Sequence, residues 1–215
     1  QHVSDATLNT EPPPPAFASR FSSLVGSLLY AATQTRPDIT YAVGMLSRVL
    51  SKPTPELMID AERVLTYLFR HRSVGLTYAA TPSTPDAYSD SDWATSHSTS
   101  GWLIRFQSAA VFFSSKKQKS IALSSAEAEI VALSEAAKDI VYFQKFCDDL
   151  CPPSVRPLSL HTDNTAARDL AYNPEHHERT KHIARRNFFI REVVEDHAIR
   201  VPFVRSDANL ADFFT

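Results

Sequence analysis

The sequence predicts an α/β fold in which a mixed five-stranded sheet, flanked by helices, follows a small helical region. Apolar residues recur at helical spacing in the first third of the chain, whereas short β-rich segments alternate with helices in the rest. The 215 residues suffice for one large domain or two small ones. A hydrophobic content of 43% with a formal net charge of −2 excludes a disordered chain.

The first part of the chain is expected to be helical after a tail. Residues 1–19 are polar and contain four consecutive prolines, which favour a stiff extended spacer. From Phe21 onward, apolar residues at helical spacing predict an amphipathic helix. Thr35 and Asp38 mark the start of a second helix, and a Thr-Pro pair further on starts a third. We therefore expect a helical unit over residues 20–80.

The second part, residues 86–215, is expected to form the sheet and its covering helices. Short β-rich segments are predicted at residues 87–92, 101–106, 109–114, 120–123, 157–162 and 199–204. Helices are predicted at residues 125–150, 165–171, 180–195 and 209–214.

Composition narrows the class of protein. No apolar run approaches the ~18 residues that cross a membrane, and the polar start of the chain does not resemble a signal peptide. Cys147 and Cys151 are too few for a disulfide framework, which indicates a reducing compartment, and they lack the paired spacing of a zinc site. The near-neutral charge means that nucleic acid could be held only by local basic patches.

Acidic residues stand at the ends of predicted elements in the second part. They are Asp90 and Asp92 in one strand, Glu127 and Glu129 at the start of the long helix, and Asp163 and Asp212 before two later helices. Charged residues are disfavoured in strands, so the presence of both Asp90 and Asp92 in one strand needs an explanation. Acids from separate element ends can converge beside a sheet, and Mg²⁺ prefers such oxygen ligands. Two ions roughly 3.5–4 Å apart can activate water and stabilise the leaving oxygen of a phosphodiester.

Each acid also has an ordinary structural explanation. Glu127 fits a capping box with the serine three residues before it, and Asp163 could cap a helix. Asp212 could be favoured by a helix dipole. Glu129 is harder to explain in this way because it shares the packed face of its helix with Leu133. The ordered set, rather than any single acid, carries the metal-site hypothesis.

Short motifs occur in one order along nearly the whole chain. They are residues 23–30, 35–43, 88–94, 98–101, 114–119, 122–129, 163–164, 179–183 and 210–212. The most specific are SSKKQK at 114–119 and ALSSAEAE at 122–129. In these motifs the chain resembles the reverse transcriptase–ribonuclease H part of copia-type LTR retrotransposon polyproteins.

The resemblance implies an RNase H-like fold whose Asp-Glu-Asp-Asp site hydrolyses the RNA strand of RNA–DNA hybrids. Its catalytic and metal-binding residues would be Asp90, Glu129, Asp163 and Asp212, holding two Mg²⁺ ions that Mn²⁺ could replace. Glu129 is preferred over Glu127 because largely apolar residues follow the glutamate in the family's helix. Asp92 and Glu127 would be flanking acids with an open, auxiliary role.

Many RNases H also carry a histidine shortly before the last aspartate, and this chain has none there. That role would be vacant or fall to His182, which could equally pack against a helix. Two basic patches are expected to contact the hybrid's backbone. They are Lys116, Lys117 and Lys119 in one patch, and Arg179, Lys181, Arg185 and Arg186 in the other. Trp93 and Trp102 are candidates for lining the groove, although a core position is favoured for Trp102.

Two other functions compete with this interpretation. An integrase or transposase of the same superfold would have its glutamate last, whereas here it comes second. A domesticated or inactive module would bind nucleic acid or protein without cutting, and the presence of every candidate acid argues against it.

The resemblance also implies which partners the protein has and where in the cell it is found. Residues 20–80 resemble a thumb and connection without the palm's aspartates, so the implied partner is the polymerase region of the same polyprotein. A homodimer through the N-terminal helices is an alternative way to bury their apolar stripes. The implied location is intracellular, in cytoplasmic virus-like particles or the nucleus, with no membrane association.

Overall fold

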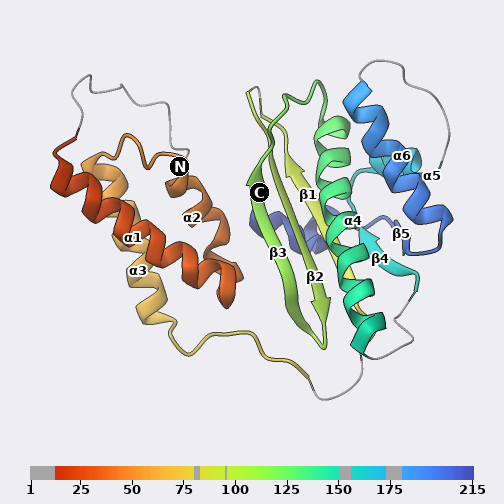
Figure 1. Ribbon diagram of the computed structural model, residues 1–215, viewed down its shortest axis with the longest axis horizontal. Coiled ribbons are helices and arrows are strands. Elements are labelled where there is room, and N and C mark those ends of the chain that lie inside the picture. Colours follow the sequence, from red (N-terminus) through yellow and green to blue (C-terminus); the bar gives the residue numbers. More distant parts are fainter. Residues whose placement is uncertain (1–12, 80–82, 95, 151–155, 173–180) are drawn as a thin grey trace. The chain divides into compact units, whose positions relative to one another are not determined.

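The chain forms two compact units, Gln1–Gly75 and Leu76–Thr215. The computed structural model describes residues 13–79, 83–94, 96–150, 156–172 and 181–215 (Figure 1). Arg179 lies outside the described residues, and so do the side chains of Lys181 and His182. The predictions for these three residues therefore remain predictions.

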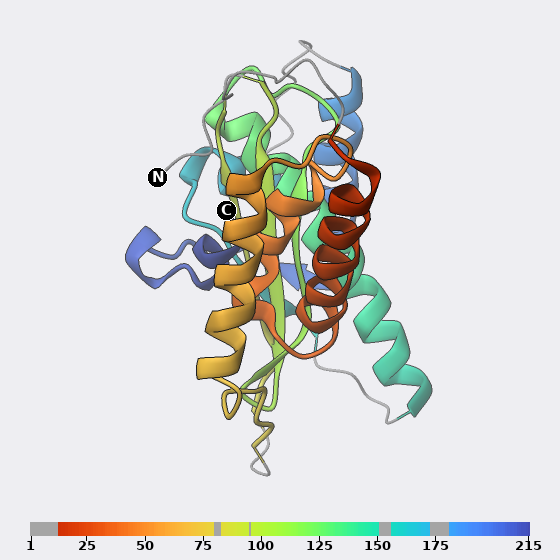
Figure 2. The same cartoon turned by 90° about the vertical axis from the view of Figure 1, so that its left-hand side faces the viewer.

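The N-terminal unit is a three-helix arrangement with its own core. It consists of α1 (Pro15–Gln34), η1 (Pro37–Ile39), α2 (Thr40–Ser47) and α3 (Pro55–Arg70). Figure 2 shows α1 and α3 side by side, and α2 packs against both. The core contains Phe21, Val25, Leu28, Ile39, Val43, Leu46, Met58 and Ala61. Most residues of the apolar stripes are buried within the unit, although Leu29 and Leu50 are exposed, and nothing in the described residues supports the predicted homodimer.

The start of α1 corrects one prediction. The helix begins at Pro15, inside the segment expected to be an extended tail. Proline is accepted in the first helical turn because its missing N–H has no helical partner there.

An ion pair between the buried Arg36 and the more exposed Asp38 joins the η1 region to the end of α3. The Arg36 guanidinium donates to both oxygens of Asp38, at 2.9 and 2.7 Å, and to the carbonyl oxygen of His71 at 3.2 Å. The Tyr67 hydroxyl donates to the same carboxylate at 3.0 Å. Burial alone would raise the pKa of Asp38, but these hydrogen bonds outweigh it and hold the pKa below its ordinary value.

The C-terminal unit is built on a five-stranded sheet. Its strands are β1 (Asp86–Asp92), β2 (Thr99–Phe106), β3 (Ala109–Lys117), β4 (Leu158–His161) and β5 (Ile199–Arg200). The strand order is β3-β2-β1-β4-β5, with antiparallel pairing among the first three strands. β4 runs parallel to both β1 and β5. This mixed sheet confirms the predicted RNase H-like fold class.

Helices cover one face of this sheet, and a short C-terminal segment covers part of the other. α4 (Ser125–Leu150), α5 (Thr165–Tyr172) and α6 (Lys181–Glu195) lie on one side (Figure 1). Neighbouring residues of β2 point to opposite faces, and Trp102 packs in the main core with α4. Leu103 instead packs with Ala211 and Phe214 of η3 (Leu210–Phe214), which follows η2 (Ser206–Ala208).

Three predicted elements differ from the structure. Residues 120–123 are not a strand, because they lead into α4 with Ile121 and Leu123 exposed. The last strand stops at Arg200 since Pro202 has no N–H to donate, although a bridge joins Thr162 to Phe203. The last helix is a 3₁₀ segment rather than an α-helix. None of the described helices combines the length and apolarity needed to span a membrane.

Candidate metal centre

The sheet topology brings two of the predicted acids together. Tyr88 of β1 is in register with His161 of the parallel strand β4. Asp90 and Asp163 each follow two residues later, so both lie where these neighbouring strands end. α4 packs across β1 and carries Glu129 in its second turn.

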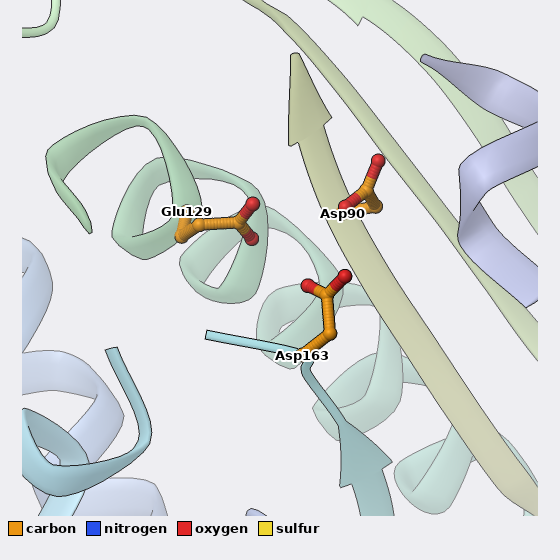
Figure 3. A group of neighbouring side chains, drawn as sticks. All are labelled: Asp90, Glu129 and Asp163. Carbon is orange, nitrogen blue, oxygen red and sulfur yellow. The ribbon is translucent and has the colours of Figure 1, made fainter. Parts of the chain in front are cut away.

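The three carboxylates converge on one point. Asp90, Glu129 and Asp163 each offer an oxygen within 4.8 Å of the other two. Figure 3 shows these side chains reaching the point from β1, from α4 and from the end of β4. Asp90 and Glu129 are buried, whereas Asp163 is half-buried. The spacing leaves room for a small cation between hard oxygen ligands, which is the donor set that Mg²⁺ prefers.

Hydrogen bonds hold one oxygen of each carboxylate. The backbone N–H of Ser91 donates to Glu129 Oε1 at 3.2 Å, and the Ser206 hydroxyl donates to Asp163 Oδ2 at 2.6 Å. The Thr215 hydroxyl donates to Asp90 Oδ2. Among the described residues, Glu129 Oε2 is buried without a partner. An unpaired buried carboxylate oxygen is costly, and a bound cation would satisfy it.

The electrostatics of the group also favour a cation. Burial, followed by the charges of Asp90 and Asp163, raises the pKa of Glu129 to about 8. Burial likewise raises the pKa of Asp90, with smaller contributions from the charges of Asp163 and Asp212. The metal-free site therefore disfavours the negative charge that three neighbouring carboxylates would carry.

Asp212, the predicted fourth ligand, lies near this group but outside it. It is exposed on η3, and its charge contributes to the raised pKa of Asp90. The buried Asn209 anchors η3, because its side-chain amide donates to the Ser89 carbonyl at 3.2 Å and accepts from the Ala211 N–H at 3.1 Å. The structure thus brings three of the four predicted ligands together and places the fourth on a neighbouring segment.

The two flanking acids are occupied by backbone hydrogen bonds. Asp92 accepts from the N–H of Thr99, which closes the end of the β1–β2 pair. Glu127 accepts from the N–H of Leu123 at 2.7 Å, while its own N–H donates to Ser124 Oγ at 3.2 Å. The bond to Ser124 Oγ is the one expected of the capping box that the sequence offered as the ordinary explanation for Glu127, while the carboxylate accepts from the residue before the cap instead of from the cap itself.

The first basic patch lies beside the site in the sheet. Ser91 is paired with Ser100, which is paired with Lys116, so Lys116 and Lys117 stand two strands away from the end of β1. Both lysines and Lys119 are exposed. The Lys116 ammonium lies 5.2 Å from the centre of the Trp102 ring.

Of the second patch, the structure describes the side chains of Arg185 and Arg186. Arg185 is exposed, and Arg186 pairs with Glu135 of α4 at 2.6 Å. Part of the charge of this patch is therefore already balanced inside the protein.

Four residues that support the site were not predicted. Three of them act across long sequence separations: Ser206 donates to Asp163, Thr215 donates to Asp90, and Asn209 donates to the carbonyl oxygen of Ser89, next to Asp90. Gln118 is buried and donates from Nε2 to Ser100 Oγ and to the Ala128 carbonyl, both at 2.9 Å, which ties β2 to the first turn of α4. Its place inside the SSKKQK motif was the one signal that could have identified it.

The fold and the site together define the class of protein, which is an RNase H-like fold with an acidic cluster that fits a divalent cation. No family model matches the chain. It is 36% identical over 199 residues to the retrovirus-related Pol polyprotein of transposon TNT 1-94 from Nicotiana tabacum, covering 91% of this chain and 15% of that protein. It is also 36% identical over 202 residues to the retrovirus-related Pol polyprotein of transposon RE1 from Arabidopsis thaliana, and the match covers 92% of this chain and 14% of that protein.

The chain is therefore homologous to a segment of the retrovirus-related Pol polyproteins of copia-type transposons. It spans about one seventh of the length of these relatives. Among solved structures, the foamy viral protease–reverse transcriptase in complex with an RNA/DNA hybrid matches 93% of this chain and 26% of that one. The TM-score is 0.57 at 13% sequence identity, which supports the fold alone.

Proposed function

We propose that this chain is a Mg²⁺-dependent ribonuclease H that hydrolyses the RNA strand of RNA–DNA hybrids during retrotransposon reverse transcription. The observation that carries the proposal is the convergence of Asp90, Glu129 and Asp163 around an unpartnered Glu129 oxygen. These residues would hold Mg²⁺, or Mn²⁺ in its place, and Asp212 would complete the set from η3. Two such ions would activate a water molecule and stabilise the charge that develops on the phosphodiester.

The protein's own groups orient the ligands before substrate arrives. Ser91 N–H and the Ser206 hydroxyl each fix one oxygen of their carboxylate and leave the other oxygen for the site. Attack of water on phosphorus forms one P–O bond and breaks the bond to the 3′ oxygen. The released 3′ oxygen takes up a proton, so the products carry 3′-OH and 5′-phosphate ends.

Recognition of the hybrid would come from local features. Lys116 and Lys117, which are exposed at the end of β3, would contact phosphates on the strand held at the acids. The 2′-hydroxyl groups distinguish the RNA strand from DNA. In the longer polyprotein, the polymerase region would supply the hybrid as it copies RNA, inside cytoplasmic virus-like particles.

Substrate choice tests this function. The full chain is incubated with 5′-labelled RNA in three forms: paired with DNA, paired with RNA, and single-stranded. We expect Mg²⁺-dependent cleavage of the hybrid alone, with fragments that carry 3′-OH ends. Binding of the hybrid without cleavage in Mg²⁺ or Mn²⁺ would instead establish a non-cutting module, and cleavage of all three RNAs would exclude a ribonuclease H.

A further inference from the structure

An exposed apolar surface lies where β1 ends and where the chain enters α4, two of the elements that carry metal-site ligands. Trp93 directly follows β1 and is 58% exposed, in contrast to Trp102, which is 1% exposed in the core. Ile121 and Leu123, at 54% and 69% exposure, precede α4. We call Trp93, Ile121 and Leu123 the Trp93 platform. Single exposed apolar residues are common on proteins, but large apolar groups gathered at one place indicate a binding surface.

The platform is fixed to the metal-site elements by hydrogen bonds. The Trp93 indole N–H donates to the carbonyl oxygen of Ala122, the residue between Ile121 and Leu123, at 3.3 Å. The Leu123 N–H is held by the Glu127 carboxylate in the first turn of α4. Since the indole bond links the end of β1 to the segment before α4, the aromatic face is held in place before any ligand binds.

The location of the platform identifies its occupant. Trp93 follows Asp90 by three residues, which is about 10 Å of extended chain. The exposed Lys116 and Lys117 end β3 at the same end of the sheet at which β1 ends, and the exposed Lys119 follows them in the chain. An exposed apolar ring at the end of the sheet that also carries acids fit to hold a cation and lysines that attract phosphate is suited to a nucleic-acid strand, whose sugars and bases offer apolar faces between charged phosphates.

From this geometry we infer that the Trp93 platform packs against the sugars or bases of the hybrid next to the phosphate cleaved at the acidic site. Trp93 is thus a substrate-positioning residue rather than a metal ligand. The inference rests on the proposed function, and it adds an aromatic contact to the lysine patches as a source of affinity and of cleavage position.

Tryptophan fluorescence tests the inference directly, because the chain has two tryptophans and Trp102 is buried. In an Asp163→Asn background, which should bind hybrid without cutting it, added hybrid should change the exposed tryptophan's emission, and Trp93→Phe should abolish that change. Trp93→Ala should weaken hybrid binding about tenfold. Phe146→Ala, which removes a ring with a similar exposure of 51% on α4, should leave binding unchanged.

Two readouts separate a local effect from a structural one. Trp93→Ala in the otherwise unchanged chain should keep the Mg²⁺-induced rise in Tm and should raise KM for the hybrid more than it lowers kcat. Trp93→Phe, which preserves an aromatic ring, should retain most of the affinity even if the alanine variant folds poorly.

Failure of the Trp93 inference can be distinguished from failure of the proposed ribonuclease function. If the hybrid binds by anisotropy while Trp93 emission and the affinity of both Trp93 variants stay the same, the inference is overturned and the ribonuclease function stands. A protein partner would then be the better occupant of the platform. If the chain neither binds nor cleaves hybrid, the proposed function fails and the inference fails with it.

Discussion

The backbone N–H of Ser91 donates to Glu129 Oε1 at 3.2 Å, and this bond joins the strand that carries one metal-site acid to the helix that carries another. The second oxygen of Glu129 remains buried and unpartnered among the described residues. The carboxylate is thus positioned by one oxygen and left open at the other, which is the arrangement expected of a residue that binds a cation.

Mg²⁺ should therefore stabilise the folded protein in a manner that depends on Glu129. Millimolar Mg²⁺ is expected to raise the Tm of the wild-type C-terminal unit by several degrees, because a ligand that binds only the folded state adds to its stability. Glu129→Gln should remove this shift. Asp169→Asn, a change to an exposed acid on α5 paired with Arg168, should keep it. Equal shifts in all three proteins would show that Mg²⁺ binds elsewhere.

The metal-free protein should lose stability as pH rises. The pKa of Glu129 is about 8 in the fold and 4.5 as its ordinary value, so the folded state holds the proton more tightly than the unfolded state. The free energy of unfolding should fall between about pH 4.5 and pH 8, by at most a few kcal/mol. Urea titrations in EDTA at both ends of this range measure the change.

Glu129→Gln provides the control for that pH dependence. The amide can still accept from the Ser91 N–H but cannot ionise. The free energy of unfolding of the variant should therefore fall less as pH rises, and at pH 8 without metal the variant should be more stable than the wild type. A wild-type protein whose stability is unchanged or rises over this range would contradict the assignment of a buried, destabilised carboxylate.

Gly101→Ala should disturb the segment that carries Asp212. A Cβ atom at Gly101 would lie 2.7 Å from Phe214 Cβ and 2.9 Å from the Ala211 carbonyl oxygen. We expect a loss of roughly 1–3 kcal/mol in the free energy of unfolding, together with weaker Mg²⁺ binding, because η3 must move. Gly26→Ala is the matched control: nothing lies within 4 Å, and alanine in the interior of α1 should stabilise by roughly 0.5–1 kcal/mol.

The β3 lysines should govern the salt dependence of hybrid binding. Replacing Lys116 and Lys117 by alanine in the Asp163→Asn background should weaken binding and lower the slope of log affinity against log salt by about one to two. Lys145→Ala, at an exposed position on α4, should change neither quantity. An unaltered slope in the double variant would remove these lysines from the proposed interface.

Much of the fold and three of the acids could be predicted because they depend on local patterns. The acid positions at element ends and the apolar periods of the helices are visible along the chain without knowledge of tertiary contacts. By contrast, Ser206 meets Asp163 and Asn209 meets Ser89 only through chain folding, and small polar residues of this kind carry no periodic signal.

Other differences have equally physical causes. Alternating apolar residues at 120–123 favoured a strand, but Leu123 is held by the helix cap of Glu127, and the apolar side chains are exposed beside Trp93. Arg36 was not identified as a buried residue, because a guanidinium becomes buried only when partners such as Asp38 and the His71 carbonyl satisfy it. Capping and ion pairing thus overrode hydrophobic pattern and residue type at these positions.

Hybrid cleavage by single-acid variants tests the central claim most directly. Wild-type, Asp163→Asn, Glu129→Gln and Asp169→Asn proteins are compared on one labelled RNA–DNA hybrid in Mg²⁺, with folding checked by circular dichroism. The account predicts cleavage by the wild type and Asp169→Asn, and a loss of at least about a hundredfold in the other two. Full activity in folded Asp163→Asn or Glu129→Gln protein would contradict it.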